Sequence, residues 1–144
     1  MKKNVTLFYA DDDADDLDFF RDVTEAIDKN IEVFTHDNGN ELLVAVKNPP
    51  PSPHIIFLDL NMPGKDGFEV LRELKTSEEY KNIPVVIFST SNDQKNILRS
   101  KELGANLYIT KPNSFAKFRK SIEHTLSINW DVFKPSLESF CYSC

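Results

Sequence analysis

The chain has 144 residues, of which 40% are hydrophobic and 28% charged, and its formal net charge is −6. This length suits one domain that buries its own core without metal or disulfide bonds. The acidic balance argues against direct binding of nucleic acid, because a phosphate backbone is held by Lys and Arg. No stretch approaches the ~20 apolar residues that a membrane span needs, and the apolar run near the N-terminus is too short for a signal peptide. We therefore expect a cytoplasmic protein.

Short apolar runs alternate with amphipathic stretches along the chain. The apolar runs predict strands over residues 5–10, 55–58, 84–89 and 107–109, and residues 31–35 are expected to form a further short strand. Between them, apolar residues recur at helical spacing and predict helices, over residues 17–27, 41–47, 66–75, 93–103 and 115–126. The proline-rich segment 48–53 must end the second helix.

Strands that alternate with helices predict an α/β fold. Uninterrupted apolar strands are typical of a parallel sheet covered on both faces, and right-handed crossovers then make it doubly wound. Residues 1–128 are expected to form this domain and residues 129–144 a ragged tail, with no further domain. Cys141 and Cys144 have the spacing of a redox or half-zinc pair, but the context that either would need is not visible.

Polar residues follow the predicted strands at four places. Asp11 and Asp12 follow the first strand, Asp59 the third, Ser89 ends the fourth, and Lys111 follows the fifth. In a doubly wound sheet the carboxyl ends of the strands meet at one edge, where ligands bind. Three carboxylates that lie close together need a compensating cation. Oxygen ligands without His or Cys favour Mg²⁺ over zinc.

Asp59 is the best candidate nucleophile of this group, because it ends the most apolar strand and a tight turn follows it. Carboxylates form covalent aspartyl phosphates. Lys111 would neutralise one phosphoryl oxygen and Ser89 would donate a hydrogen bond to another. Phosphoryl transfer depends mostly on positioning and charge stabilisation, so these few groups can suffice.

At this point the chain resembles the receiver domain of two-component response regulators. The matching segments are YADDD (9–13), FLDLNMPGKDGFEVL (57–71), PVVIFSTS (84–91) and GANLYITKP (104–112). The resemblance runs from about residue 4 to 127 and implies five strands in the order 2-1-3-4-5 with five helices. It is similar to stand-alone receivers, such as the small phytochrome-associated regulators.

The resemblance also implies a role for each residue of the magnesium site. Asp59 would be the phosphoacceptor and a metal ligand. Asp12 would bind Mg²⁺ directly, Asp11 would bind it through water, and Asn61 would offer its backbone carbonyl.

A second set of residues would form the switch. Ser89 and Tyr108 would be the switch residues, although an aromatic at position 108 could equally be packed core. Lys111 would bind the phosphoryl group, and its peptide bond to Pro112 is cis in the family.

The implied protein is a phosphoacceptor switch rather than an enzyme with an external substrate. A histidine kinase or a histidine phosphotransfer protein would supply the phosphoryl group, and self-catalysed phosphotransfer and dephosphorylation would be its only reactions. The output would pass to an unknown downstream protein, without nucleic acid or membrane. Aromatic residues of the tail, Phe133, Phe140 and Tyr142, would allow a homodimer.

Three alternatives stay open. A phosphatase of the haloacid dehalogenase type also uses an aspartate nucleophile, but it needs a second Asp where this chain has Asn61. A flavodoxin-like module would place a phosphate loop after the first strand, where three aspartates stand instead. A degenerate receiver acting as a constitutive scaffold is the third.

Overall fold

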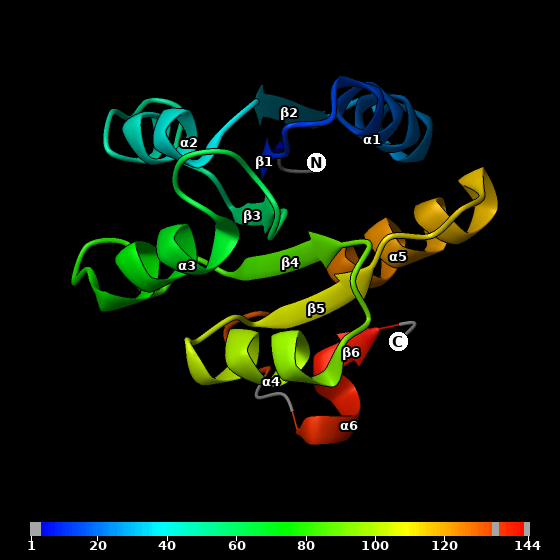
Figure 1. The fold of residues 1–144 in the computed structure, drawn as a ribbon. Helices are drawn as coiled ribbons and strands as arrows, with labels where there is room; N and C mark the ends of the chain where they lie inside the picture. The colour runs from blue at the N-terminus through cyan, green and yellow to red at the C-terminus, as the bar shows by residue number, and fades with distance from the viewer. Residues whose placement is uncertain (1–3, 134–135, 143–144) are drawn as a thin grey trace.

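The protein folds around one parallel sheet with helices packed on both of its faces (Figure 1). The structure, a computed structural model, describes residues 4–133 and 136–142. The strands are β1 Val5–Ala10, β2 Ile31–His36, β3 Ile55–Leu58, β4 Val85–Ser89, β5 Leu107–Thr110 and β6 Cys141–Tyr142. The helices are α1 Ala14–Ile27, α2 Gly39–Val46, α3 Gly67–Thr76, α4 Gln94–Glu102, α5 Phe115–Ser127 and α6 Leu137–Phe140.

Each face of the sheet has its own hydrophobic core. Neighbouring strand residues point to opposite faces, so Phe8 of β1 belongs to the core under α2, α3 and α4, and Tyr9 to the core under α1 and α5. Apolar residues on both faces explain why the central strands β3 and β4 appear as nearly continuous apolar runs. No helix among the described residues is both long and apolar enough to cross a bilayer.

Polar side chains cap the starts of the five long helices. Each accepts a hydrogen bond from a backbone N–H of the first turn, which would otherwise lack a partner, and these caps are Asp13, Asn38, Asp66, Asp93 and Ser114. The cap at Asp13 accounts for the third aspartate of the acidic run. This run is therefore both a helix start and, through Asp11 and Asp12, part of the strand-end cluster described below.

The expected strand order and the five long helices are confirmed, but the expectation of five strands is wrong. The observed order is β2-β1-β3-β4-β5-β6, because β6 pairs in parallel with β5 and the short helix α6 precedes it. Phe140 anchors this segment: it is 1% exposed, and its ring centroid lies 6.5 Å from that of Tyr108. A two-residue strand has no periodicity that a sequence pattern could reveal, and here it covers an edge of the sheet that would otherwise be open.

The chain between α5 and α6 also folds back on the domain. Trp130 packs against the core under α1 and α5, and its ring meets that of Phe133 edge to face at 5.5 Å. Cys144 lies outside the described residues, so the two interpretations of the cysteine spacing are not tested.

Candidate phosphoacceptor and metal site

The carboxyl ends of β1, β3, β4 and β5 bring the expected residues to one edge of the sheet. The pairing of Ala10 with Leu58 aligns the ends of β1 and β3, and the backbone N–H of Asp59 donates to the carbonyl of Ala10 at 3.0 Å. The backbone N–H of Lys111 likewise donates to the carbonyl of Ser89 at 2.8 Å. Residues that are up to 100 positions apart therefore meet because of the sheet register.

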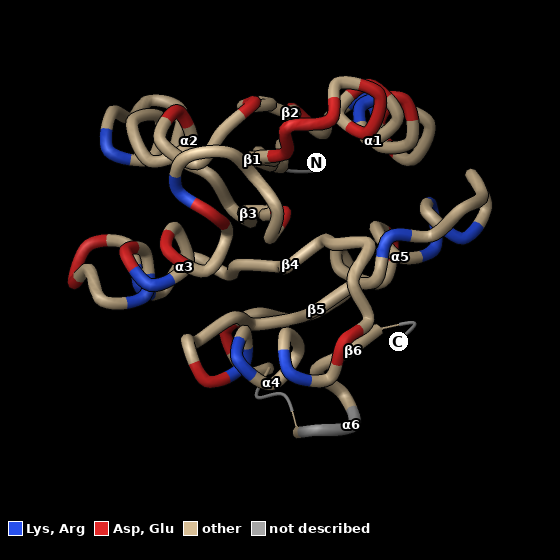
Figure 2. Tube along the Cα trace, viewed as in Figure 1, with Lys and Arg blue, Asp and Glu red and all other residues tan. Residues whose placement is uncertain are grey.

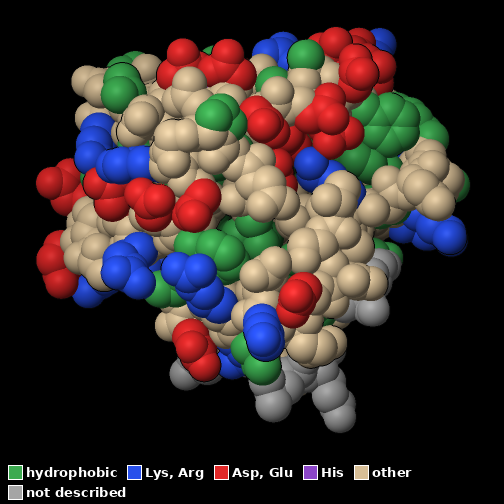
Figure 3. Space-filling model, in the orientation of Figure 1, with side chains coloured by type: hydrophobic (Ala, Val, Ile, Leu, Met, Phe, Trp, Pro, Cys, Tyr) green, Lys and Arg blue, Asp and Glu red, His purple; other side chains and the backbone are tan. Residues whose placement is uncertain are grey.

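Three of these residues form a cluster of carboxylates. One oxygen each from Asp11, Asp12 and Asp59 lies within 4.8 Å of the other two. Asp11 is fully buried and Asp59 is 5% exposed, whereas Asp12 faces solvent. Figure 2 shows acidic residues along the connection from β1 to α1, and Figure 3 shows acidic side chains gathered over this end of α1. Closely spaced oxygen ligands with one open side fit a hard cation such as Mg²⁺.

Lys111 supplies the positive charge within this group. Its Nζ lies 2.6 Å from Oδ2 of Asp11, 2.8 Å from Oδ2 of Asp16 and 3.9 Å from Oδ1 of Asp59. Burial works against the charged form, but the hydrogen bonds to Asp11 and Asp16 outweigh it and raise the pKa of Lys111. The lysine therefore stays charged and offsets part of the carboxylate repulsion.

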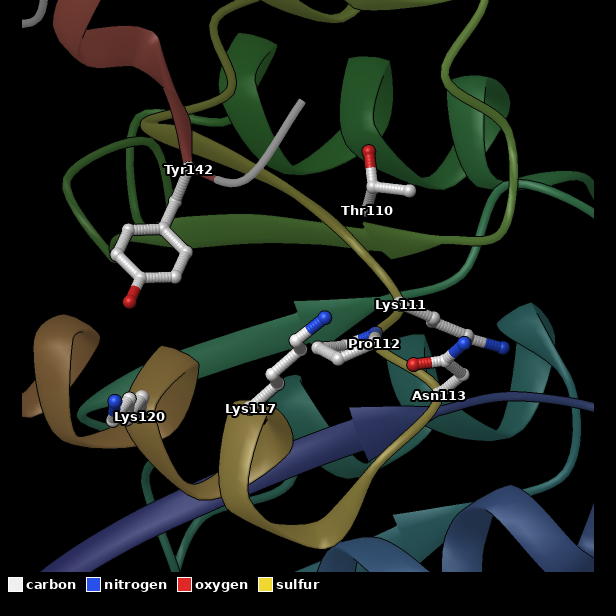
Figure 4. A pocket seen from close by; sticks show the side chains of 7 residues that line it. All are labelled: Thr110, Lys111, Pro112, Asn113, Lys117, Lys120 and Tyr142. Atoms are coloured by element: carbon white, nitrogen blue, oxygen red, sulfur yellow. The ribbon is translucent and has the colours of Figure 1, made fainter.

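A separate hollow lies beside the loop that follows β5. Its volume is about 440 Å³, and it is lined by Thr110, Lys111, Pro112, Asn113, Lys117, Lys120 and Tyr142. Figure 4 shows the Lys111 side chain pointing away from Tyr142. Its ammonium therefore binds the carboxylate cluster, although Lys111 is also one of the residues that line this cavity.

Two residues of the network were not among the sequence candidates. The buried Tyr9 hydroxyl donates a hydrogen bond to Oδ2 of Asp11, and Asp16 binds Lys111. Strand alternation could have indicated Tyr9, because positions 9 and 11 lie on the same side of an extended chain. No local pattern separates Asp16 from the other acids of the α1 start.

The environment of Asp59 makes its carboxyl harder to ionise than usual when no cation is bound. Burial raises the pKa of Asp59 to about 7; Lys111 opposes this shift, Asp11 adds to it, and a hydrogen bond from the backbone of Asn61 opposes it again. A bound cation would shift the balance back toward the carboxylate. Metal binding and proton release are therefore expected to be coupled at Asp59.

The residues expected to form the switch lie beside this cluster. Ser89 is fully buried at the end of β4, and its Oγ accepts a hydrogen bond from the backbone N–H of Ser91 at 3.2 Å. Tyr108 is also fully buried, and its hydroxyl donates to the carbonyl of Ser91 at 2.6 Å. In this structure Tyr108 is thus part of the core and is linked to the loop after β4.

The expectation of a cis peptide bond between Lys111 and Pro112 is wrong. The cis peptide bonds of the described residues precede Pro50 and Pro51 instead. The two isomers of a bond before proline differ by only about 0.5–1 kcal/mol, so the tertiary surroundings, rather than the dipeptide, decide which one is present.

Comparison with known proteins agrees with this geometry. A family model described as the response regulator receiver domain matches residues 7–123. Response regulator Rcp1 of Synechocystis is 42% identical over 73 residues, which cover 51% of this chain and 50% of Rcp1, so the chain spans about half the length of that relative.

Two solved structures are similar over 92% of this chain and 99% of their own. The Mn²⁺-bound form of response regulator Rcp1 has a TM-score of 0.75 at 28% identity. The phosphorylated cyanobacterial phytochrome response regulator RcpA has a TM-score of 0.79 at 30% identity.

Proposed function

Within the family of response regulator receiver domains, to which this chain belongs, we propose that Asp59 accepts a phosphoryl group in a Mg²⁺-dependent reaction. The observation that carries the proposal is the convergence of Asp59, Lys111 and two further aspartates in one partly open site. A phosphohistidine of a histidine kinase or of a histidine phosphotransfer protein would be the donor. An Asp59 oxygen attacks phosphorus, the P–N bond breaks, and the released imidazole takes up a proton.

The residues of the carboxylate cluster would hold the cation. Asp12 and Asp59 would bind it directly, Asp11 through water, and Asn61 through its backbone carbonyl. Bound there, Mg²⁺ would neutralise charge that develops on the phosphoryl oxygens. The Mn²⁺-bound form of the similar Rcp1 supports a divalent cation in this protein as well.

Lys111 and Ser89 would bind the phosphoryl group after transfer. Lys111 already lies 3.9 Å from Asp59, and Ser89 is buried at the end of the neighbouring strand. Phosphorylation would add about −1 charge and new acceptor oxygens to the site. The Lys111 ammonium and the Ser89 hydroxyl are already in place to donate hydrogen bonds to these oxygens. Tyr108 is hydrogen-bonded to Ser91, which follows Ser89 closely in the chain. A movement of the Ser89 hydroxyl toward the phosphoryl group would therefore be passed through Tyr108 to the surface.

The protein would then act as a switch and not as an enzyme with an external substrate. Its partners would be the phosphoryl donor and a downstream protein, in the cytoplasm. Residues 1–128 would be the receiver domain and residues 129–144 its tail, in keeping with a family match that ends at residue 123. A homodimer through the tail remains a prediction.

The proposal is tested by labelling the purified protein with acetyl phosphate, with Mg²⁺ and with a chelator. We expect one phosphoryl group per chain by intact mass, lost in Asp59→Asn and in the chelator. Asp18→Asn, an exposed acid on α1, is the matched control and should be labelled normally. Labelling of the Asp59→Asn variant would show that another residue is the acceptor.

A further inference from the structure

Lys111 is shared between the phosphoacceptor site and a carboxylate that has no part in it. Its Nζ lies closer to Asp16, at 2.8 Å, than to Asp59, at 3.9 Å. Asp16 belongs to the first turn of α1, and its side chain is 33% exposed. It contributes neither to the cluster of Asp11, Asp12 and Asp59 nor to any step proposed above.

The other partner of Lys111 is held much more firmly. Oδ2 of Asp11 accepts from the buried Tyr9 hydroxyl as well as from Lys111, and Oδ1 accepts from the backbone N–H of Asp13 at 3.0 Å. Asp11 is also fully buried, whereas the only hydrogen bond found for the Asp16 carboxylate among the described residues is the one to Lys111. When Lys111 shifts toward Asp59, the contact with Asp16 is the one that is free to break.

Charge makes the same distinction. Three carboxylates, those of Asp11, Asp16 and Asp59, form ion pairs with the Lys111 ammonium, and a fourth, that of Asp12, clusters with Asp11 and Asp59. Metal binding would use the carboxylates of Asp11, Asp12 and Asp59. Phosphorylation would then add about one further negative charge to the site. The Asp16 carboxylate competes with the phosphoryl oxygens for Lys111 and also repels them.

We infer that Asp16 is a positioning residue, which holds Lys111 in the resting protein and opposes its transfer to the phosphoryl group on Asp59. Asp16 thereby weakens the phosphorylated state relative to the resting state. The inference rests on the proposed function of Asp59, but the contact between Asp16 and Lys111 belongs to the unphosphorylated protein and can be measured there.

The first experiment measures the affinity for beryllofluoride, a phosphoryl mimic, in saturating Mg²⁺ by calorimetry. Asp16→Asn is expected to bind it about three- to tenfold more tightly than the unchanged protein, as suits a charged hydrogen bond at a partly exposed site. Asp15→Asn is the matched control. It removes the same charge from the same helical turn, but Asp15 is exposed and makes no ion pair with Lys111.

Asp16→Glu adds a rescue test, because it keeps a carboxylate that can reach Lys111 and should restore an affinity close to that of the unchanged protein. A purely structural or long-range charge effect would give Asp15→Asn and Asp16→Asn the same affinity, and that result would overturn the inference. Weaker binding by Asp16→Asn would overturn it too, because Asp16 would then assist the phosphorylated state.

The second experiment needs neither metal nor phosphoryl mimic. The NMR signal of the Lys111 ammonium protons should be visible in the resting protein and should broaden by faster exchange with water in Asp16→Asn, but not in Asp15→Asn. An unchanged signal in Asp16→Asn would refute the anchoring contact. Failure of the unchanged protein to bind beryllofluoride would instead refute the proposed function, and the ammonium signal would still decide on the anchor.

Discussion

Burial of Asp59 should make the metal-free protein less stable as the pH rises. The pKa of this carboxyl is about 7 in the folded protein and 3.8 without the protein environment. Between these values the native state retains a proton that the unfolded state has lost, so the free energy of unfolding falls as the pH rises from about 4 to 7. At pH 8 both states are ionised, and the native state bears the full cost of a buried, poorly compensated charge.

The size of this cost follows from the same two values. The rise from 3.8 to about 7 corresponds to about 4 kcal/mol at most. Asp59→Asn keeps the shape of the side chain and removes the charge. We therefore expect it to raise the free energy of unfolding by roughly 2–4 kcal/mol at pH 8 in a chelator. At pH 5 the native carboxyl is mostly protonated already, and the gain should be much smaller.

Urea unfolding followed by fluorescence measures this effect, because Trp130 is the only tryptophan of the chain and is packed on the core. The variant and the unchanged protein are compared in a chelator at pH 5 and pH 8, with Asp18→Asn as an exposed control. Adding Mg²⁺ should stabilise the unchanged protein and hardly affect Asp59→Asn. Equal gains at both pH values, or no gain at pH 8, would show that burial does not raise the pKa of Asp59.

Three further substitutions test other parts of the site and fold. Lys111→Ala leaves the buried Asp11 carboxylate without its cation, so it should destabilise the metal-free protein by about 3 kcal/mol. Calorimetry should still show Mg²⁺ binding, but signalling should be lost. Retained signalling would count against the proposed role of Lys111. Gly67→Ala places a methyl group against the carbonyl oxygen of Asp59 and 2.7 Å from Cα of Leu60. It should lower the free energy of unfolding by about 1–3 kcal/mol, as followed by thermal unfolding, and slow labelling by acetyl phosphate. Normal labelling would mean that the turn after Asp59 adjusts freely. Phe140→Ala should lower the free energy of unfolding by about 3 kcal/mol and expose backbone amides of β5 to hydrogen exchange. Unchanged exchange would show that the pairing of β6 does not depend on the Phe140 side chain.

Much of the fold and of the candidate site could be predicted from local patterns. The strands β1, β3, β4 and β5 appear as largely apolar runs because they are mostly buried on both faces, whereas the edge strand β2 is only partly buried. The long helices show their apolar spacing and their caps. The sequence predicts one site for Asp11, Asp12, Asp59, Ser89 and Lys111, because parallel strands share one edge for their carboxyl ends. That rule needs only the order of the elements along the chain.

Only the tertiary structure decided the contacts that depend on register and on side-chain reach. Asp16 and Lys111 are 95 positions apart, and nothing local distinguishes Asp16 from its acidic neighbours until the end of β5 is placed beside α1. The strand β6 has two residues, which are too few to show an alternating apolar pattern. It forms because it pairs with the edge strand β5 and because Phe140 beside it is buried in the core. Local sequence sets the conformational preference of each segment, whereas these interactions gain their free energy only when distant segments are packed together.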